Sequence, residues 1–301
     1  MRPLFDCVNN AKGFVVTDFV TFGNQKRLVN FKGVIKLAER DEYLIHYFHF
    51  IEVFLGCFCW AEGNVDNIVL DPKLLDIKLI RSVIHSVLPN VKFNVKDFST
   101  DIFVLNDRDL YPKRLMEQRT IQQCVKYTPL FKKQVYDNLG IKPKQKPKRV
   151  EDITVTYIFR NPGSKNRYLS NRESLFYEIR KKGVKLQIIK FEDLTYENQV
   201  RLVANTDILI GVHGNGLTNL LWLPTHGYVF EFFGSFHHYG YQVLSEITNG
   251  GYIGIENKKI YNKGTRSGGA HGKAKDPVTL DIQIFLKEFN MIIKNLIFSI
   301  N

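Results

Sequence analysis

Apolar strand-like runs and helical patterns alternate through the C-terminal half of the chain, and this order restricts the fold more than any other feature. Strands are predicted at 153–159, 184–190, 207–212 and 228–233, and helices at 171–182, 196–205 and 216–223 lie between them. A β-α-β-α-β-α-β order produces a parallel sheet with helices on its faces. Such sheets bind ligands where their strands end, so we expect the loops after Phe159, Val212 and Phe233 to face the site.

A basic, proline-containing run precedes this half. Residues 142–149 read Lys-Pro-Lys-Gln-Lys-Pro-Lys-Arg, which favours a solvated linker between domains. Before it, strand and helix patterns alternate again and end in a helix over 112–139 with a break near Pro129. We predict an N-terminal domain at 1–141, a linker at 142–150 and a C-terminal domain at 151–301. Within the last of these, 262–277 is expected to be a mobile loop, and the helix at 280–299 could pack back on the N-terminal domain.

The composition is typical of a globular protein, and the net positive charge favours an anionic partner. The 301 residues suffice for two domains, and the formal charge of +12 favours nucleic acid or a phosphorylated small molecule as partner. The 4 cysteines lack metal-ligand spacing, which indicates buried free thiols in a reducing setting. No apolar run is long enough to span a bilayer, and the first seven residues lack the apolar core of a signal peptide. We expect a cytoplasmic protein, although a chain trimmed of a secretory leader would look the same.

The stretch from Asp207 to Asn219 combines a strand, glycines and the start of a helix. Gly214 and Gly216 allow a ligand to approach the backbone, and a helix beginning near Gly216 would direct free N–H groups at an anion such as phosphate. The spacing differs from the dinucleotide GxGxxG pattern and from the P-loop. On spacing alone, a tight turn with a helix cap is an equally good interpretation.

The same stretch resembles a known family. Residues 211–219 read Gly-Val-His-Gly-Asn-Gly-Leu-Thr-Asn and are followed by Leu223-Pro224 and by a strand carrying Glu231. This order resembles the signature of the family 61 glycosyltransferases, which include protein O-linked N-acetylglucosaminyltransferases and plant xylosyl- and arabinosyltransferases. The resemblance covers about residues 153–235, with a weaker match around 43–55.

A second element lies upstream. Phe159-Arg160, Asn166-Arg167 and Asn171 are similar to the arginine-containing loop of that family. The chain departs from the pattern at Asn215, where the family usually has Ala or Ser, and at Arg172, where it usually has Glu. The residues Ser170-x-x-Glu173 also fit a capping box that starts a helix.

The resemblance implies an α/β fold of GT-B type, with two Rossmann-like domains facing a central cleft. It also implies inverting transfer of a sugar, xylose or N-acetylglucosamine, from a UDP-sugar to a hydroxyl of a glycan or glycoprotein, without a metal or other cofactor. Arginines and helix N-termini would then stabilise the leaving diphosphate. The expected donor-binding residues are Arg160, Arg167, Asn171, His213, Gly214, Asn215, Gly216, Leu217, Thr218, Asn219 and Glu231. Among these, His213 would bind phosphate or brace the loop, and Glu231 would accept the ribose hydroxyls.

The catalytic base should come from the other domain. His46, His49 and Glu52 share one face of a helix, and His49-Phe-Ile-Glu52 resembles a His-x-x-Asp element of the family. We favour Glu52 as the base, with His49 second. There are two alternatives for this triplet. The histidines could be buried core residues with satisfied hydrogen bonds, or the three side chains could bind a metal, although no fourth ligand is evident. The pair in Asp107-Arg108-Asp109 is interpreted as a loop and helix start, so no metal site is predicted.

Two other functions fit some of these residues. The positive charge would suit a nucleic-acid-binding module, but the basic residues cluster in the linker and beside the glycine motif, so we predict no nucleic-acid partner. The departures at Asn215, Arg172 and Glu52 would suit a degenerate transferase that binds a glycan without catalysis.

Overall fold

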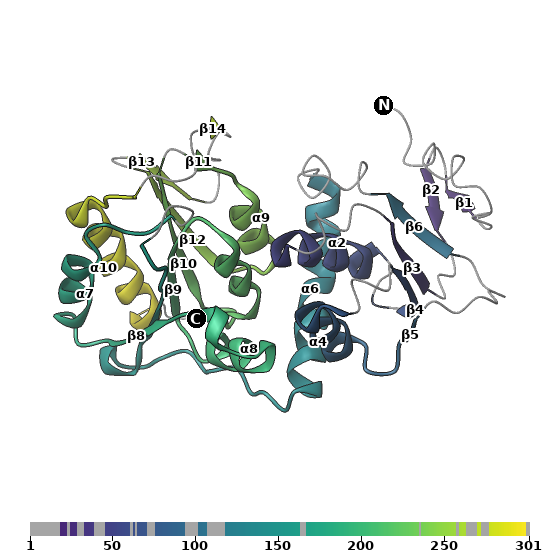
Figure 1. Cartoon of the computed structure of the whole chain (residues 1–301), viewed down its shortest axis with the longest axis horizontal. Helices are drawn as coiled ribbons and strands as arrows, with labels where there is room; N and C mark the ends of the chain where they lie inside the picture. The colour runs from purple at the N-terminus through teal and green to yellow at the C-terminus, as the bar shows by residue number, and fades with distance from the viewer. Residues whose placement is uncertain are drawn as a thin grey trace. The chain divides into compact units, whose positions relative to one another are not determined.

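Figure 1 shows the computed structural model of the chain, which describes residues 19–22, 25–28, 33–38, 46–60, 63, 65–70, 76–93, 102–106, 118–162, 167–234, 236–256, 259–262, 270–271 and 277–298. Contacts divide the chain into two compact units, Met1–Leu139 and Gly140–Asn301. At the boundary Gly140 has a φ of +61°, a conformation that glycine readily adopts after a helix. Among the described helices, none has both the length and the apolar character needed to cross a membrane.

The second unit is built on a sheet of six strands in the order β13-β12-β10-β9-β7-β8. The strands are β7 (Thr154–Ile158), β8 (Lys185–Ile189), β9 (Ile208–Val212), β10 (Tyr228–Phe233), β12 (Gly251–Glu256) and β13 (Lys259–Tyr261). The first five pair in parallel and only β13 runs antiparallel to its neighbour β12. The predicted parallel sheet is confirmed, with β12 and β13 added to it.

The strand order contains a change of direction next to β7. From β7 the chain adds β8 on one side, then crosses to add β9, β10 and β12 on the other side. The connections from β7 and β9 therefore leave on opposite faces, and a crevice forms between the carboxyl ends of these two strands. Open α/β sheets bind their ligands at this switch point.

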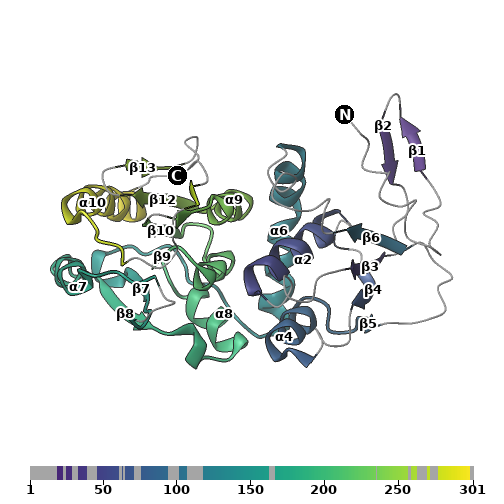
Figure 2. The same ribbon diagram turned by 45° about the horizontal axis from the view of Figure 1, so that its top comes forward.

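Helices cover both faces of this sheet, as Figure 2 shows. One face carries α7 (Arg172–Arg180) and α10 (Ile282–Phe298), which contact each other. The other carries α8 (Tyr196–Ala204), the 3₁₀ helix Asn215–Trp222 and α9 (Gly240–Ile247). Because both faces are covered, the central strand β9 is buried along its whole length and reads as a continuous apolar run.

Strand β10 shows how alternation distributes side chains between the two faces. Phe230 and Phe232 enter the core on the α7 and α10 face, where the ring of Phe230 lies 5.0 Å from that of Phe285. Glu231, between them, points to the opposite face. Phe285 and Phe289 place the buried side of α10 in the core of the second unit, which decides where the last helix packs.

One local prediction was refined and another was wrong. The helix expected at 216–223 is present as a 3₁₀ helix over Asn215–Trp222. The capping box is not formed, because the hydroxyl of Ser170 bonds to Val278 O and Thr279 instead of the first turn of α7, whose N-cap residue is Asn171. A tertiary contact with the segment before α10 takes the place of the local cap.

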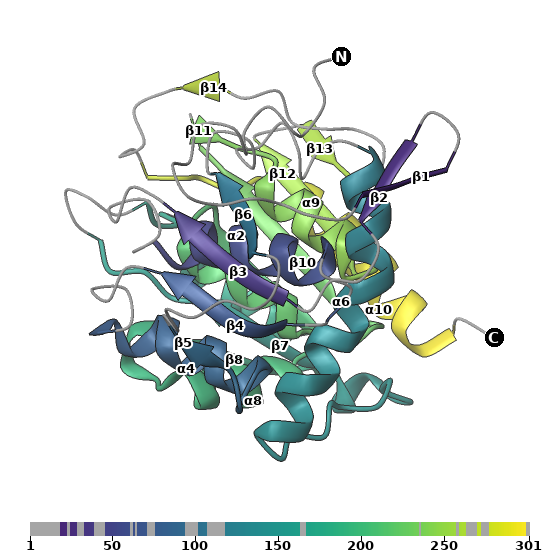
Figure 3. The same cartoon turned by 90° about the vertical axis from the view of Figure 1, so that its right-hand side faces the viewer.

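The first unit contains a second parallel sheet, in the order β5-β4-β3-β6 (Figure 3). Its strands are β3 (Gly33–Ala38), β4 (Val65–Leu70), β5 (Lys92–Phe93) and β6 (Ile102–Asn106), and a separate hairpin joins β1 (Phe19–Phe22) to β2 (Gln25–Leu28). Helices α2 (Tyr47–Trp60), α4 (Lys78–Val87) and α6 (Gln118–Asn138) pack on one another. Pro129 lies inside α6 without ending it, so the break expected there is absent from this helix.

Some predictions fall outside the described residues. They concern Asp107–Asp109, Asn166 and most of 262–277. Within that last range, β14 (Ala270–His271) pairs with β11 (Phe236–His237).

Candidate active site

The switch point of the second unit brings Arg160 against the glycine turn. Arg160 follows β7, and His213 and Gly214 follow β9, so adjacent parallel strands deliver them to one edge of the sheet. Gly214 has a φ of +155°, and a Cβ placed there would lie 2.0 Å from Nη2 of Arg160. Any side chain at this position would collide with the guanidinium, so glycine is required for this close approach. The expected meeting of the loops after β7 and β9 is thus observed.

The 3₁₀ helix that follows is stabilised by a backbone hydrogen bond, by buried side chains and by a bond to Gln199. The N–H of Leu217 donates to Gly214 O at 2.9 Å, and Leu217, Thr218 and Asn219 are each no more than 1% exposed. Nδ2 of Asn219 donates to Gln199 at 3.1 Å, and Gln199 donates in turn to Phe191 O at 3.0 Å. The three buried residues, which were predicted to bind the sugar donor, therefore stabilise the loop through interior contacts. Asn215 and Gly216 are partly exposed at its start.

Arg167 adds a second positive charge beside Arg160. Burial and the charge of Arg160 lower the pKa of Arg167, and the nearby Tyr241 and Glu231 act in the opposite direction. Because a guanidinium stays charged in proteins, the site holds two mutually repelling cations. An anion bound between them would relieve that repulsion, as a diphosphate would.

Glu231 is the buried acid of the site. It has no exposed surface, and its two carboxylate oxygens accept from Nδ1 of His213 and, at 2.7 Å, from the hydroxyl of Tyr252. Burial and the negative charge of Glu231 raise the pKa of Tyr252 well above its usual value, so this hydroxyl keeps its proton and donates. Because Glu231 has no exposed surface, a ribose hydroxyl cannot reach it in this structure, and the geometry favours a role in orienting His213.

Two glycines make room for this buried carboxylate. The strand neighbours of Glu231 are Gly211 on β9 and Gly254 on β12. A Cβ on Gly254 would lie 2.8 Å from the hydroxyl of Tyr252, so a larger residue would push that hydroxyl away. Sequence reasoning missed Tyr252 because β12 had not been assigned. The alternation Tyr252-x-Gly254 within an apolar run was the signal that could have found it.

The ring of His213 is enclosed by aromatic side chains. Its centroid lies 5.6 Å from that of Phe233 and 5.3 Å from that of Tyr241. Tyr241, on α9, is the second residue that the sequence analysis missed. Burial and the charge of Glu231 raise the pKa of Tyr241, so its hydroxyl keeps its proton and can act as a hydrogen-bond donor beside His213.

Asn171 lies outside this group. Its Nδ2 donates to Leu280 O at 2.8 Å, and its Oδ1 accepts from Leu280 N at 3.0 Å. Both ends of the carboxamide are therefore used to fix the segment before α10. The predicted donor contact is replaced by a structural one.

The candidate bases lie on α2 of the first unit. Nδ1 of His49 is 3.5 Å from Oε2 of Glu52, and Glu52 is only 8% exposed. The His46 and His49 rings are 4.8 Å apart. Within the described part of the chain, no group of three His, Cys, Asp or Glu side chains could hold a metal ion, so the metal interpretation of this triplet gains no support. A carboxylate beside an imidazole is instead suited to accepting a proton.

Comparison with known proteins assigns the family. The profile described as Glycosyltransferase 61 matches residues 47–230. The chain belongs to this family. The match runs from the first residue of α2 into β10, so it includes both candidate bases, both arginines and the glycine turn.

Curated proteins similar to this chain include several named EGF domain-specific O-linked N-acetylglucosamine transferase. The chain is 32% identical to the one from Drosophila melanogaster over 128 residues, or 41% of this chain and 24% of that protein. It is 46% identical to the one from Gallus gallus over 50 residues, or 17% of this chain and 9% of that protein. With the Canis lupus familiaris protein it shares 37% over 84 residues, or 27% of this chain and 16% of the relative. The aligned parts thus cover a quarter or less of these relatives.

Proposed function

We propose that this family 61 chain transfers a sugar from a UDP-sugar to a hydroxyl of a glycan or glycoprotein acceptor. The observation that carries the proposal is the guanidinium of Arg160 lying on Gly214 at the switch point, with Arg167 beside it. Two cations and the start of a 3₁₀ helix form a receptor for a diphosphate. The names of the relatives favour N-acetylglucosamine as the sugar, with xylose as the second choice.

The reaction would invert the anomeric carbon in one displacement. The acceptor oxygen bonds to the anomeric carbon as the bond to the diphosphate breaks, and the acceptor proton passes to Glu52 or His49. Arg160 and Arg167 would take up the negative charge that develops on the leaving diphosphate. His213, whose Nδ1 is held by Glu231, would contact the diphosphate or brace the glycine turn around it.

A GT-B arrangement is part of the proposal. Support comes from the presence of a parallel sheet with packed helices in each of the two units. In such a fold one domain supplies the donor site and the other supplies the base, which fits the distribution of the candidate residues between the units.

The first test is calorimetric binding and thermal shift with UDP, GDP, UDP-xylose, UDP-glucose and UDP-N-acetylglucosamine. A ligand that binds only the folded protein raises its unfolding temperature. We expect stabilisation by UDP and most strongly by UDP-N-acetylglucosamine, followed by turnover with that donor. Binding of none of these nucleotides would reject the proposal in favour of a non-catalytic glycan- or nucleic-acid-binding protein.

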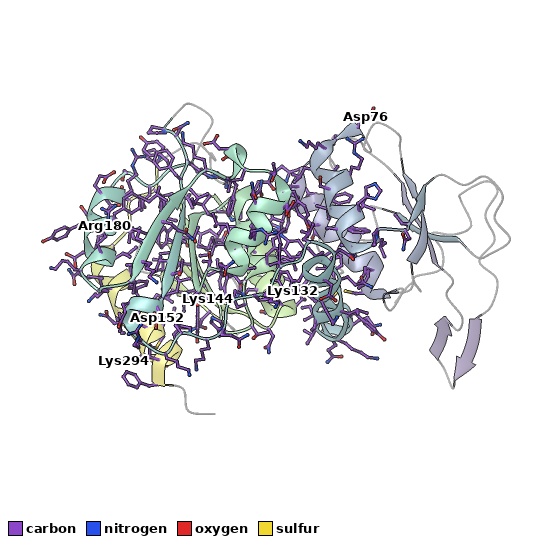
Figure 4. The ribbon with its side chains drawn as sticks, turned by 90° about the horizontal axis from the view of Figure 1, so that it is seen from below. Asp76, Lys132, Lys144, Asp152, Arg180 and Lys294 are labelled. Atoms are coloured by element: carbon purple, nitrogen blue, oxygen red, sulfur yellow. The ribbon has the colours of Figure 1, made fainter. Side chains whose placement is uncertain are left out.

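Arg160→Ala is expected to weaken UDP binding by ~10–100-fold, since a lost charge-assisted hydrogen bond costs about 1.5–3 kcal/mol. Isothermal calorimetry measures the change. The control is Arg180→Ala, because Arg180 is exposed on α7 and points away from the unit (Figure 4). Equal losses in the two variants, or none in Arg160→Ala, would remove Arg160 from the diphosphate site.

Removal of divalent cations with EDTA is expected to leave the transfer rate unchanged. The reason is that Arg160 and Arg167 supply the positive charge that a metal supplies in other transferases. The rate is measured with UDP-N-acetylglucosamine before and after chelation. A loss of activity that Mn²⁺ or Mg²⁺ restores would establish a metal-dependent mechanism instead.

A further inference from the structure

A basic depression lies on the sheet edge opposite the candidate active site. One hollow of about 610 Å³ is lined by residues 144–149 together with Thr154 and Lys185, the first residues of β7 and β8. A second hollow of about 510 Å³ shares Thr154, Lys185 and Asn205 with the first and extends to Arg201 on α8. The shared residues join the two hollows into one groove at the amino ends of the strands. Arg160 and His213 follow the carboxyl ends.

One wall of this groove is the run 142–149, here called the basic strap. The strap is tied to the second unit at Lys144, while most of its other residues are exposed. Lys144 N donates to Ala204 O at 2.9 Å, and Lys144 Nζ donates to Asp152 O at 2.6 Å, to Thr154 Oγ1 at 2.9 Å and to the buried carboxylate of Asp207 (Figure 4). The strap therefore holds its other positive charges in a defined place.

Those charges are only partly neutralised. Lys144 pairs with Asp207, and Arg149 pairs with Glu151 and Asp152. Lys148 on the strap and Lys185 across the groove are exposed, and no ion pair involves either of them among the described residues. The groove thus keeps net positive charge on both walls and would attract an anionic chain.

The other lining groups narrow the class of ligand. Gln145 and Asn198 offer amide groups that can bond to hydroxyls, whereas the amides of Gln187 and Asn205 already donate to Thr156 and to Arg201 O. None of the described residues lining the two hollows is aromatic. Single-stranded nucleic acids are usually held by aromatic stacking. Charge together with amide hydrogen bonds suits a carbohydrate that carries acidic groups. We propose that this groove is a second binding site for a sulfated carbohydrate chain, separate from the donor site.

The test is binding of a heparin-derived octasaccharide to the full chain by calorimetry at several salt concentrations. Lys148→Glu combined with Lys185→Glu is expected to weaken binding tenfold or more, on the order of what losing two ionic contacts to a polyanion costs. The matched control is Lys287→Glu with Lys294→Glu, which changes the net charge equally at exposed positions of α10. UDP binding, measured alongside, should be unchanged in both double variants.

Each remaining outcome decides against the proposal. If the α10 double variant weakens octasaccharide binding equally, binding depends only on the net charge of the protein. Equal binding of the desulfated octasaccharide would exclude recognition of sulfate. Tighter binding of polyuridylate or of a polyglutamate peptide would assign the groove to another class of polyanion. None of these readouts depends on sugar transfer, so failure here is distinct from failure of the proposed function.

Discussion

Glu52→Gln is expected to lower the rate of sugar transfer by ~10²–10⁴-fold, the range that general-base catalysis supplies. Glutamine has the shape of glutamate but cannot accept the acceptor proton. UDP affinity should stay the same, because Glu52 lies on α2 of the first unit and the arginines lie in the second. Initial rates with UDP-N-acetylglucosamine and calorimetry with UDP measure the two effects separately.

His49→Gln serves as the comparison, since Nδ1 of His49 lies 3.5 Å from Glu52. If His49 only orients or polarises Glu52, its removal should cost less than the removal of the carboxylate. Full activity of Glu52→Gln with inactive His49→Gln would give the base role to the histidine. Full activity of both would place the base elsewhere, and retained hydrogen-exchange protection of α2 confirms that the first unit of either variant is folded.

Asp207→Ala is expected to destabilise the second unit by about 3 kcal/mol or more. The reason is that it removes a buried carboxylate and leaves the groups that donate to it without an acceptor. Asp207 has no exposed surface and accepts from Lys144, from Thr154 N at 2.7 Å and from His226 at 2.8 Å. These bonds join the basic strap, the start of β7 and the turn before β10. Their loss should open all three segments together.

Native-state hydrogen exchange measures this effect locally, since protection factors report the free energy of opening for each segment. We expect protection of β7 and β9 to fall together with that of the basic strap. The matched control is Asp193→Ala, because Asp193 is exposed and forms no ion pair with any residue that the structure describes. For this variant the change should stay within about 0.5 kcal/mol. Unchanged protection in Asp207→Ala would show that Lys144 and His226 contribute little to folding.

Local patterns were sufficient to place most of the second unit. The strands β7 to β10 and the helices α7, α8 and α10 lie within a few residues of their predicted bounds. These predictions depend on hydrophobic periodicity, which each segment carries in its own residues. The glycine turn was equally local, because Gly214 and Gly216 mark a backbone that only small residues can form. Hence the position of the glycine turn after β9 followed from the sequence.

Partners that are distant in sequence were decided only by the tertiary structure. Asn171 looked like a ligand residue, but its carboxamide is used by Leu280, 109 residues away. Glu231 looked accessible at a strand end, but Tyr252 and His213 enclose it within the sheet. The basic strap looked like a free linker, but Asp207, 63 residues beyond Lys144, fixes it.

These three corrections have one physical cause. A sequence specifies which side chains are polar and which face of a strand or helix they occupy. The partner that a buried polar group finds depends on how separate elements pack, because every such group must be satisfied once water is excluded. The sequence by itself therefore determined the parallel sheet, the glycine turn and the family. Packing decided which of the polar residues can reach a ligand and which form internal hydrogen bonds that stabilise the fold.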